Sequence, residues 1–222
     1  PAGRSSTYMR NAIIPNLYAE IKGLWKHQFA GIGIDYKRLR PRLSSTMGGK
    51  LYKVNETLNS VSGIIFGALQ YPDWHLYTKW TYGENLDELN MINGYAVTCT
   101  SPVTGTRGYT PMRALSWWID AGVKCNEQVE PGVYVGYTKN IGSRTNLWRD
   151  SDGNVIVYGR APDLDHVATI CPRLYWRVNA FKLGIEVVYS QASYGTINDH
   201  GTIDNPVGVG DFRFHMALYY FF

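Results

Sequence analysis

The sequence predicts an all-β fold, an antiparallel transmembrane β-barrel in which about nine strands are visible within one domain, residues 1–222. Three observations predict it. Many segments alternate apolar and polar residues, no stretch approaches the ~18 apolar residues of a spanning helix, and Trp, Tyr and Phe make up 14% of the chain. A strand crosses a bilayer with only ~9–11 residues and one apolar face.

The C-terminal segment, residues 211–222, shows the clearest alternation. Successive side chains of a strand point to opposite faces of its sheet. One face of this segment is wholly apolar, and it consists of Phe212, Phe214, Met216, Leu218, Tyr220 and Phe222. The other face carries Asp211, Arg213 and His215. A long amphipathic strand that ends on an aromatic residue is typical of the last strand of an outer-membrane barrel.

The same alternation predicts eight earlier strands. In chain order they are residues 16–25, 30–37, 55–69, 74–82, 115–124, 132–139, 168–179 and 181–190. The segments 55–69 and 132–139 alternate less cleanly than the others. Trp25 and Trp74 fall beside short turns on apolar faces, where the aromatic girdle of a barrel is expected.

The connections between these strands alternate in length. Short turns are expected at residues 26–27, 71–73, 124–131 and 179–180, and long polar loops at 41–50, 84–110, 141–165 and 193–208. Bacterial outer-membrane barrels sort their connections in this way, with the short turns in the periplasm. A Greek-key sandwich does not, because its connections cross between two sheets.

The direction of the strands sets a further expectation. If long loops are extracellular, the segments 16–25 and 211–222 both run toward the periplasm. Antiparallel closure then requires an odd number of further strands before residue 1, or one strand within the first few residues. An open sheet edge is not viable inside a bilayer. We therefore expect the C-terminal portion of a larger barrel.

Composition argues against several other classes. The three cysteines are widely spaced, which excludes a disulfide scaffold or a zinc knuckle. The net charge of +4 comes from dispersed residues and gives little support to nucleic-acid binding. Residues 150–154 resemble the start of a calcium loop but lack its downstream Glu, so we interpret them as a polar turn. No metal or other cofactor is expected.

The faces opposite the apolar ones carry the candidate pore-lining residues. These are Lys22, Lys37, Lys79, Asp120, Arg173, Arg177, Lys182, Glu186, Arg213 and His215. Arg173 and Arg177 share a face of one strand, roughly 13 Å apart. Two interpretations stay open. The basic residues form a path that attracts anions, or they pair with the carboxylates and stiffen the wall.

Two other functions remain as alternatives. A soluble, Tyr-rich β-sandwich that binds a ligand has a similar composition, with 17 Tyr. An enzymatic outer-membrane barrel needs a nucleophile with a His in reach, and only His75 and His215 of the five histidines fall on inward faces. The sequence has no G-x-S-x-G, P-loop or H-E-x-x-H motif. We therefore expect no catalytic residues and no enzyme.

Three stretches carry a resemblance to a known family. They are residues 82–86 with Gly94-Tyr95, residues 132–142, and residues 159–222 with their Tyr219-Tyr220-Phe221-Phe222 end. The sequence in these places resembles the DcaP-like porins, trimeric outer-membrane channels of Gram-negative bacteria. The resemblance implies a homotrimer in contact with outer-membrane lipids that passes small hydrophilic, often anionic, solutes. The N-terminal region of the family has no counterpart here.

Overall fold

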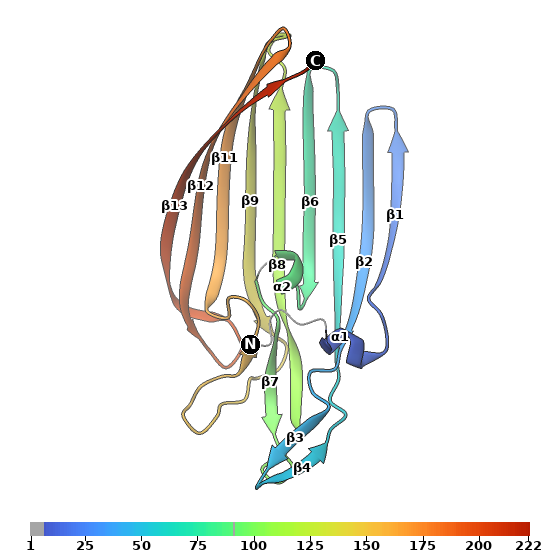
Figure 1. Ribbon diagram of the computed structural model, residues 1–222, viewed down its shortest axis with the longest axis vertical. Helices are drawn as coiled ribbons and strands as arrows, with labels where there is room; N and C mark the ends of the chain where they lie inside the picture. Colours follow the sequence, from blue (N-terminus) through green and yellow to red (C-terminus); the bar gives the residue numbers. More distant parts are fainter. Residues whose placement is uncertain (1–6, 91) are drawn as a thin grey trace.

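The computed structural model describes residues 7–90 and 92–222, and most of them lie in one large antiparallel sheet (Figure 1). Within this part of the chain nine strands follow one another as a meander. They are β1 (Leu17–Trp25), β2 (Gln28–Leu39), β5 (Leu58–Gln70), β6 (Trp74–Glu84), β8 (Arg107–Val123), β9 (Val129–Ser143), β11 (Leu164–Val178), β12 (Phe181–Ile197) and β13 (Ile203–Tyr220). All nine expected strands are confirmed, and so is the all-β, antiparallel fold class.

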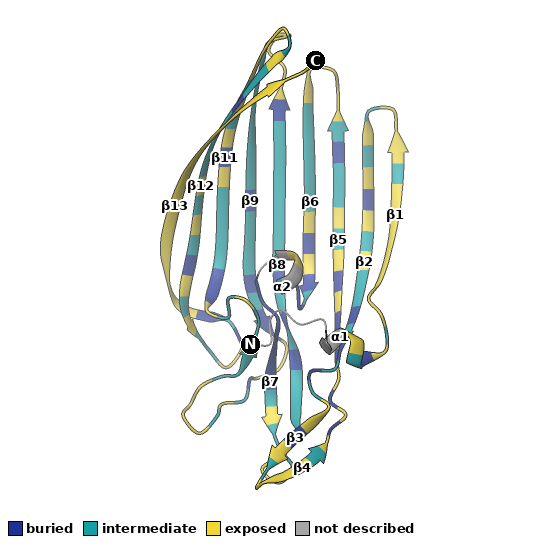
Figure 2. Ribbon diagram, in the orientation of Figure 1, coloured by how far each residue is buried: buried dark blue, intermediate teal, exposed yellow. Residues whose placement is uncertain are grey.

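The two edges of this sheet are β1 and β13. Among the described residues they pair with β2 and β12 respectively but not with each other, so the sheet is not closed into a barrel. Both run toward the end that carries the short turns, where the chain also ends (Figure 1). Figure 2 shows β13 exposed along almost its whole length, as a strand with one free edge is.

Short elements lie outside the meander. They are α1 (Thr7–Ala12), α2 (Asp87–Asn90), the hairpin of β3 (Ser44–Met47) with β4 (Lys50–Lys53), and β7 (Tyr95–Thr100), which pairs with β8 and with β10 (Val157–Tyr158). Residues 7–12 therefore form a helix and not an additional strand, and residues 1–6 lie outside the described residues. No helix in the described part of the chain is long and apolar enough to cross a membrane.

The sandwich alternative is wrong as a fold. The described strands form one large sheet and a separate two-stranded hairpin, with no second large sheet to face the first. A sandwich needs two sheets whose inner faces pack together. The apolar face of this sheet instead stays exposed, with Ile21, Ile32 and Ile65 all more than half accessible.

One expected loop is wrong. Residues 193–208 were expected to be a long loop, but β12 and β13 stay paired as far as Ile197 and Ile203. The turn between them is held by Asn198, whose carboxamide oxygen accepts from the backbone N–H groups of His200 and Thr202. The segment is rich in Gly, Asn, Asp and Thr, so its strand pattern is hidden by polar residues that here lie at the rim of the sheet.

The other three long connections are confirmed as long, and contacts beyond the strands tie all three together. Glu56, which follows the β3–β4 hairpin, accepts two hydrogen bonds from Arg42 at 2.9 and 2.6 Å and one from the backbone of Arg107. Beside them Tyr95, Tyr109 and Tyr158 form a cluster of rings with centroids 5.0–6.3 Å apart. We call this assembly the loop platform.

The segment that carries α2 folds onto the main sheet (Figure 1). Leu86 and Ile92 are almost fully buried against Ala114 and Leu164. Asn93 donates to the carboxamide oxygen of Asn140 at 2.8 Å, and Asn140 donates to the carbonyl of Gly201. We call residues 85–90 and 92–94 the inner segment. They pack against Ala114, which lies on the face of the sheet that carries the charged residues.

Candidate functional site: the charged face of the sheet

The pairing register decides which side chains share a face, because directly opposed residues of an antiparallel pair point the same way. Lys22 opposes Gly31, Gly31 opposes Phe66, and Phe66 opposes Lys79. Lys79 opposes Trp118, which shares its face with Asp120. The same chain of partners continues through β9 to β13.

By this register all ten predicted residues lie on one face of the sheet. They are Lys22, Lys37, Lys79, Asp120, Arg173, Arg177, Lys182, Glu186, Arg213 and His215. We call it the inner face. The opposite, outer face carries exposed apolar side chains of β1, β2, β5, β6, β8, β11, β12 and β13, and Trp80 is stacked on Trp117 there. Their role in lining a pore stays a prediction.

The centre of the inner face is a tight ionic cluster. The guanidinium of Arg173 on β11 contacts both carboxylate oxygens of Asp120 on β8, with Nη2 to Oδ1 at 2.6 Å. His75 on β6 is within 3.3 Å of Asp120 and 3.2 Å of Arg173. Its Nε2 donates to the carboxylate when protonated and accepts from the guanidinium when not. This paired arrangement matches the stiffening interpretation at Asp120 and Arg173.

Next to this cluster Tyr175 organises the charges of β11 and β12. The ammonium of Lys182 lies over the Tyr175 ring at 3.9 Å from its centroid, a cation–π geometry. The hydroxyl of Tyr175 donates to Glu186 at 3.4 Å. Lys182 therefore has an aromatic neighbour, and among the described residues no carboxylate lies within 4.0 Å of its ammonium.

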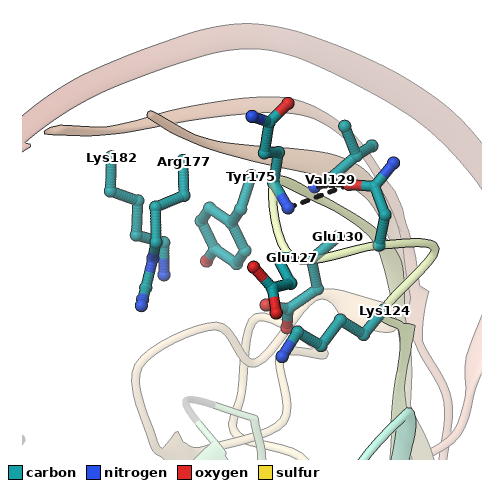
Figure 3. Close-up of a pocket in the computed structure, with 9 residues that line it drawn as sticks. Lys124, Glu127, Val129, Glu130, Tyr175, Arg177 and Lys182 are labelled. Carbon is teal, nitrogen blue, oxygen red and sulfur yellow. Dashed lines mark hydrogen bonds between the residues drawn. The ribbon is translucent and has the colours of Figure 1, made fainter. Parts of the chain in front are cut away.

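A hollow of about 170 Å³ opens at the short-turn end of this face (Figure 3). Arg177 and Lys182 lie together on one side of Tyr175, and Glu127, Glu130 and Lys124 lie toward the other (Figure 3). Among the described residues none of these five charged groups forms an ion pair within 4.0 Å. The charges at this mouth are thus available to solution.

The remaining predicted residues differ in their surroundings. Lys37 is buried, and its ammonium donates to the carbonyl of Asn85 at 3.0 Å, so it holds the inner segment in place. Arg213 pairs with Asp211 on its own strand. Lys22 lies over the ring of Phe29 at 4.0 Å. His215 opposes Glu186 across β12 and β13.

Several aromatic side chains of the inner face lie close over glycines of the same face. A β-carbon placed on Gly31 would be 2.5 Å from the ring of Phe66, and one on Gly184 would be 3.1 Å from that of Tyr175. The hydroxyl of Tyr134 lies over Gly136 in the same way. The rings use the space that the missing side chains leave.

Sequence reasoning missed two parts of this site. The sequence predicts a polar loop where the inner segment lies, although the apolar residues Leu86 and Ile92 indicate that part of it is buried. Glu127 and Glu130 fall in a predicted turn, and nothing in the sequence near them indicates that they lie close to Arg177. Their proximity arises from the pairing of β9 with β11.

A single antiparallel sheet with one apolar and one charged face is the architecture of a β-barrel wall. No protein-family model and no curated protein matches this sequence. Among solved structures, the chain is similar in shape to OmpT, an outer membrane protein of Vibrio cholerae, with a TM-score of 0.48 and 9% identity over 93% of this chain. The chain spans 56% of that protein's length. The resemblance to the DcaP-like porins stays a prediction.

Proposed function

We propose that this chain forms part of an outer-membrane porin of a Gram-negative bacterium, a passive diffusion channel for small hydrophilic solutes with a preference for anions. The proposal includes no cofactor. The observation that carries it is the separation of faces: the ten predicted polar residues share the inner face, while the outer face of the same strands is apolar and exposed. In a barrel the first face meets water and the second meets lipid.

The preference for anions rests on cations that have no carboxylate partner. In the described part of the chain Lys79, Arg177 and Lys182 form no ion pair within 4.0 Å, whereas Arg173 is neutralised by Asp120. Fixed positive charges in a narrow aqueous path attract anions and repel cations. We assign the selectivity to the mouth formed by Arg177 and Lys182, not to Arg173.

Planar-bilayer recordings of the purified, detergent-extracted protein test this assignment. Under a salt gradient the reversal potential is expected to indicate anion preference, and the double variant Arg177→Gln, Lys182→Gln is expected to reduce it. Arg173→Gln is the matched comparison, and we expect it to shift the potential less than the mouth variant does. Cation selectivity of the parent protein would contradict the proposal.

The finer assignment, a homotrimer of the DcaP-like type, is part of the same proposal. It is supported by the three sequence stretches that resemble that family. The outer face also offers large side chains for subunit contact, among them Trp80 stacked on Trp117 at 5.4 Å. Chemical cross-linking in native outer membranes is expected to yield a trimer. Detection of the monomer alone would contradict the homotrimer assignment.

A further inference from the structure

Three side chains at the long-loop end of β11 and β12 form a hydrogen-bonded chain. The Asp165 carboxylate Oδ2 lies 2.7 Å from His166 Nδ1, and His166 Nε2 lies 3.2 Å from the Ser193 hydroxyl. With the proton on Nδ1, the imidazole donates to Asp165 and accepts from Ser193. This is the order of groups in a Ser-His-Asp triad, where the carboxylate fixes the tautomer and the imidazole serves as base.

The local backbone explains why these groups meet. The β11–β12 register shifts between Leu164 and His166, which marks a bulge that contains Asp165. A bulge re-aims a side chain, and here the carboxylate of Asp165 reaches the ring of the next residue. Asp165 and Ser193 are both buried, while His166 is partly exposed.

Glycines of β13 lie opposite this part of β12. Gly208 opposes Ser193 and Gly210 opposes Gln191. The side-chain amide of Gln191 fills the space over Gly208, because a β-carbon placed on Gly208 would be 2.5 Å from the amide nitrogen of Gln191 and 3.6 Å from Ser193 Oγ. An N–H donor therefore lies on the same side of the sheet as the Ser193 hydroxyl, and acyl transfer requires such a donor for its oxyanion.

The triad lies on the outer face. His166 opposes Lys139 and Ser193, and the next residue on its face of β11 is Ala168. Two residues further along that face, a row of opposed side chains begins with Ile170, continues with Tyr189 and ends with Phe212, each more than two-fifths exposed. An acyl chain bound along this row would bring its carboxyl carbon to the triad.

We propose that Ser193, His166 and Asp165 form an esterase site on the outer face, with Gln191 as the oxyanion donor and an ester of a medium or long acyl chain as substrate. The placement of the row in lipid rests on the proposed function. This site is separate from the proposed pore, and the proposal departs from the expectation of no enzyme.

The reaction balances with water alone. Ser193 Oγ attacks the ester carbonyl carbon while its proton moves to His166 Nε2, and the tetrahedral oxyanion is held by the Gln191 N–H. The carbon–oxygen bond to the alcohol breaks, and the alcohol leaves with the proton from His166. Water then attacks the acyl-serine, its proton goes to His166, and the released Ser193 takes that proton back. The products are the alcohol and the carboxylic acid.

Activity-based labelling tests the proposal on the parent protein. The detergent-extracted, folded protein is treated with a long-chain fluorophosphonate, and the modified peptide is identified by mass spectrometry. We expect the adduct on Ser193. Absence of an adduct there in protein that migrates as folded would overturn the proposal, whatever the variants do.

Hydrolysis of a p-nitrophenyl octanoate in mixed micelles gives the second readout. Ser193→Ala and His166→Gln are expected to lower kcat by about 10³-fold or more. Ser190→Ala is the matched control, because this serine lies on the inner face of the same strand and bonds to Thr169. Hydrolysis by Ser193→Ala at the parent rate would contradict the site.

The two proposals fail separately. Ser193→Ala is expected to keep the parent's reversal potential and conductance, since its side chain lies on the face away from the proposed channel. Labelling of Ser193 in a protein that conducts no ions would contradict the porin proposal and support the esterase proposal. Ion conduction without labelling of Ser193 would support the porin proposal and contradict the esterase proposal.

Discussion

The two ends of the sheet are built differently. At the short-turn end the strands are joined by brief turns, and Lys124, Glu127 and Arg177 are exposed without ion-pair partners in the described part of the chain. At the long-loop end, charged and polar groups such as Glu56, Asn93 and Asn140 are buried and hydrogen-bonded.

The difference shows where charged groups contribute to structure and where they stay exposed to solvent. A buried ion or amide must be fully paired, because an unpaired one costs free energy. Glu56, Asn93 and Asn140 find their partners through contacts between segments far apart in sequence. The short-turn end needs no such contacts, since its charged groups stay hydrated.

The largest expected effect is on the inner segment. Leu86→Ala removes an almost fully buried side chain that packs on Ala114 and Leu164, and it should cost about 3 kcal/mol of local stability. Hydrogen exchange of the inner segment should accelerate accordingly. Leu89→Ala is the control, because Leu89 lies in α2 but is exposed. Equal acceleration by both variants would show that Leu86 does not anchor the segment.

The loop platform should respond next. Glu56→Gln removes the charge that Arg42 pairs with at 2.6 Å, and we expect a loss of about 2 kcal/mol within the platform. Limited proteolysis of residues 40–57 should become faster while the strands stay resistant. An unchanged cleavage rate would mean that the aromatic cluster alone holds the platform.

Acid should open the same platform. Burial alone would raise the pKa of Glu56, but its hydrogen bonds from Arg42 and Arg107 hold it below the ordinary value of 4.5. The resulting stability is therefore fully present above about pH 4.5 and is lost as the pH falls through the lower, folded-state pKa. Near-UV circular dichroism of the tyrosines should report this loss. A transition of the same size in Glu56→Gln would assign it to another group.

The smallest effect is expected at the short-turn end. Glu127→Gln should leave stability within about 0.5 kcal/mol of the parent, because the side chain is exposed and forms no ion pair with any residue that the structure describes. If the proposed function is right, the variant should also shift the reversal potential toward anion preference, since it removes a negative charge from the hollow that Arg177 lines. A large loss of stability would contradict the contrast between the two ends.

The sequence predicts the strands and their faces well. Alternation is a local property that the pleat of a strand imposes directly, so even residues as far apart as Lys22 and His215 were placed on the same face. It fails where polar residues continue a strand, as from Ser193 to Ile197. The lost alternation made this strand look like a loop.

The contacts of the long-loop end could not be predicted for another reason. Arg42, Glu56 and Arg107 meet only after three strands have paired, and no local pattern records that pairing. The same holds for Ser193, which is brought to His166 by the register of β11 on β12 and by a bulge. The sequence also leaves open which inner-face charges form ion pairs. In the structure Asp120 pairs with Arg173.

The aromatic side chains that lie over inner-face glycines depend on residues that have no side chain. A β-carbon on Gly31 would be 2.5 Å from the ring of Phe66, and one on Gly136 would be 2.7 Å from the hydroxyl of Tyr134. An alanine at either glycine would force the aromatic side chain to move, whereas an alanine at Gly184 would shift the ring of Tyr175, at 3.1 Å, only slightly. How far the aromatic side chains project from the inner face is therefore set in part by residues that do not project at all.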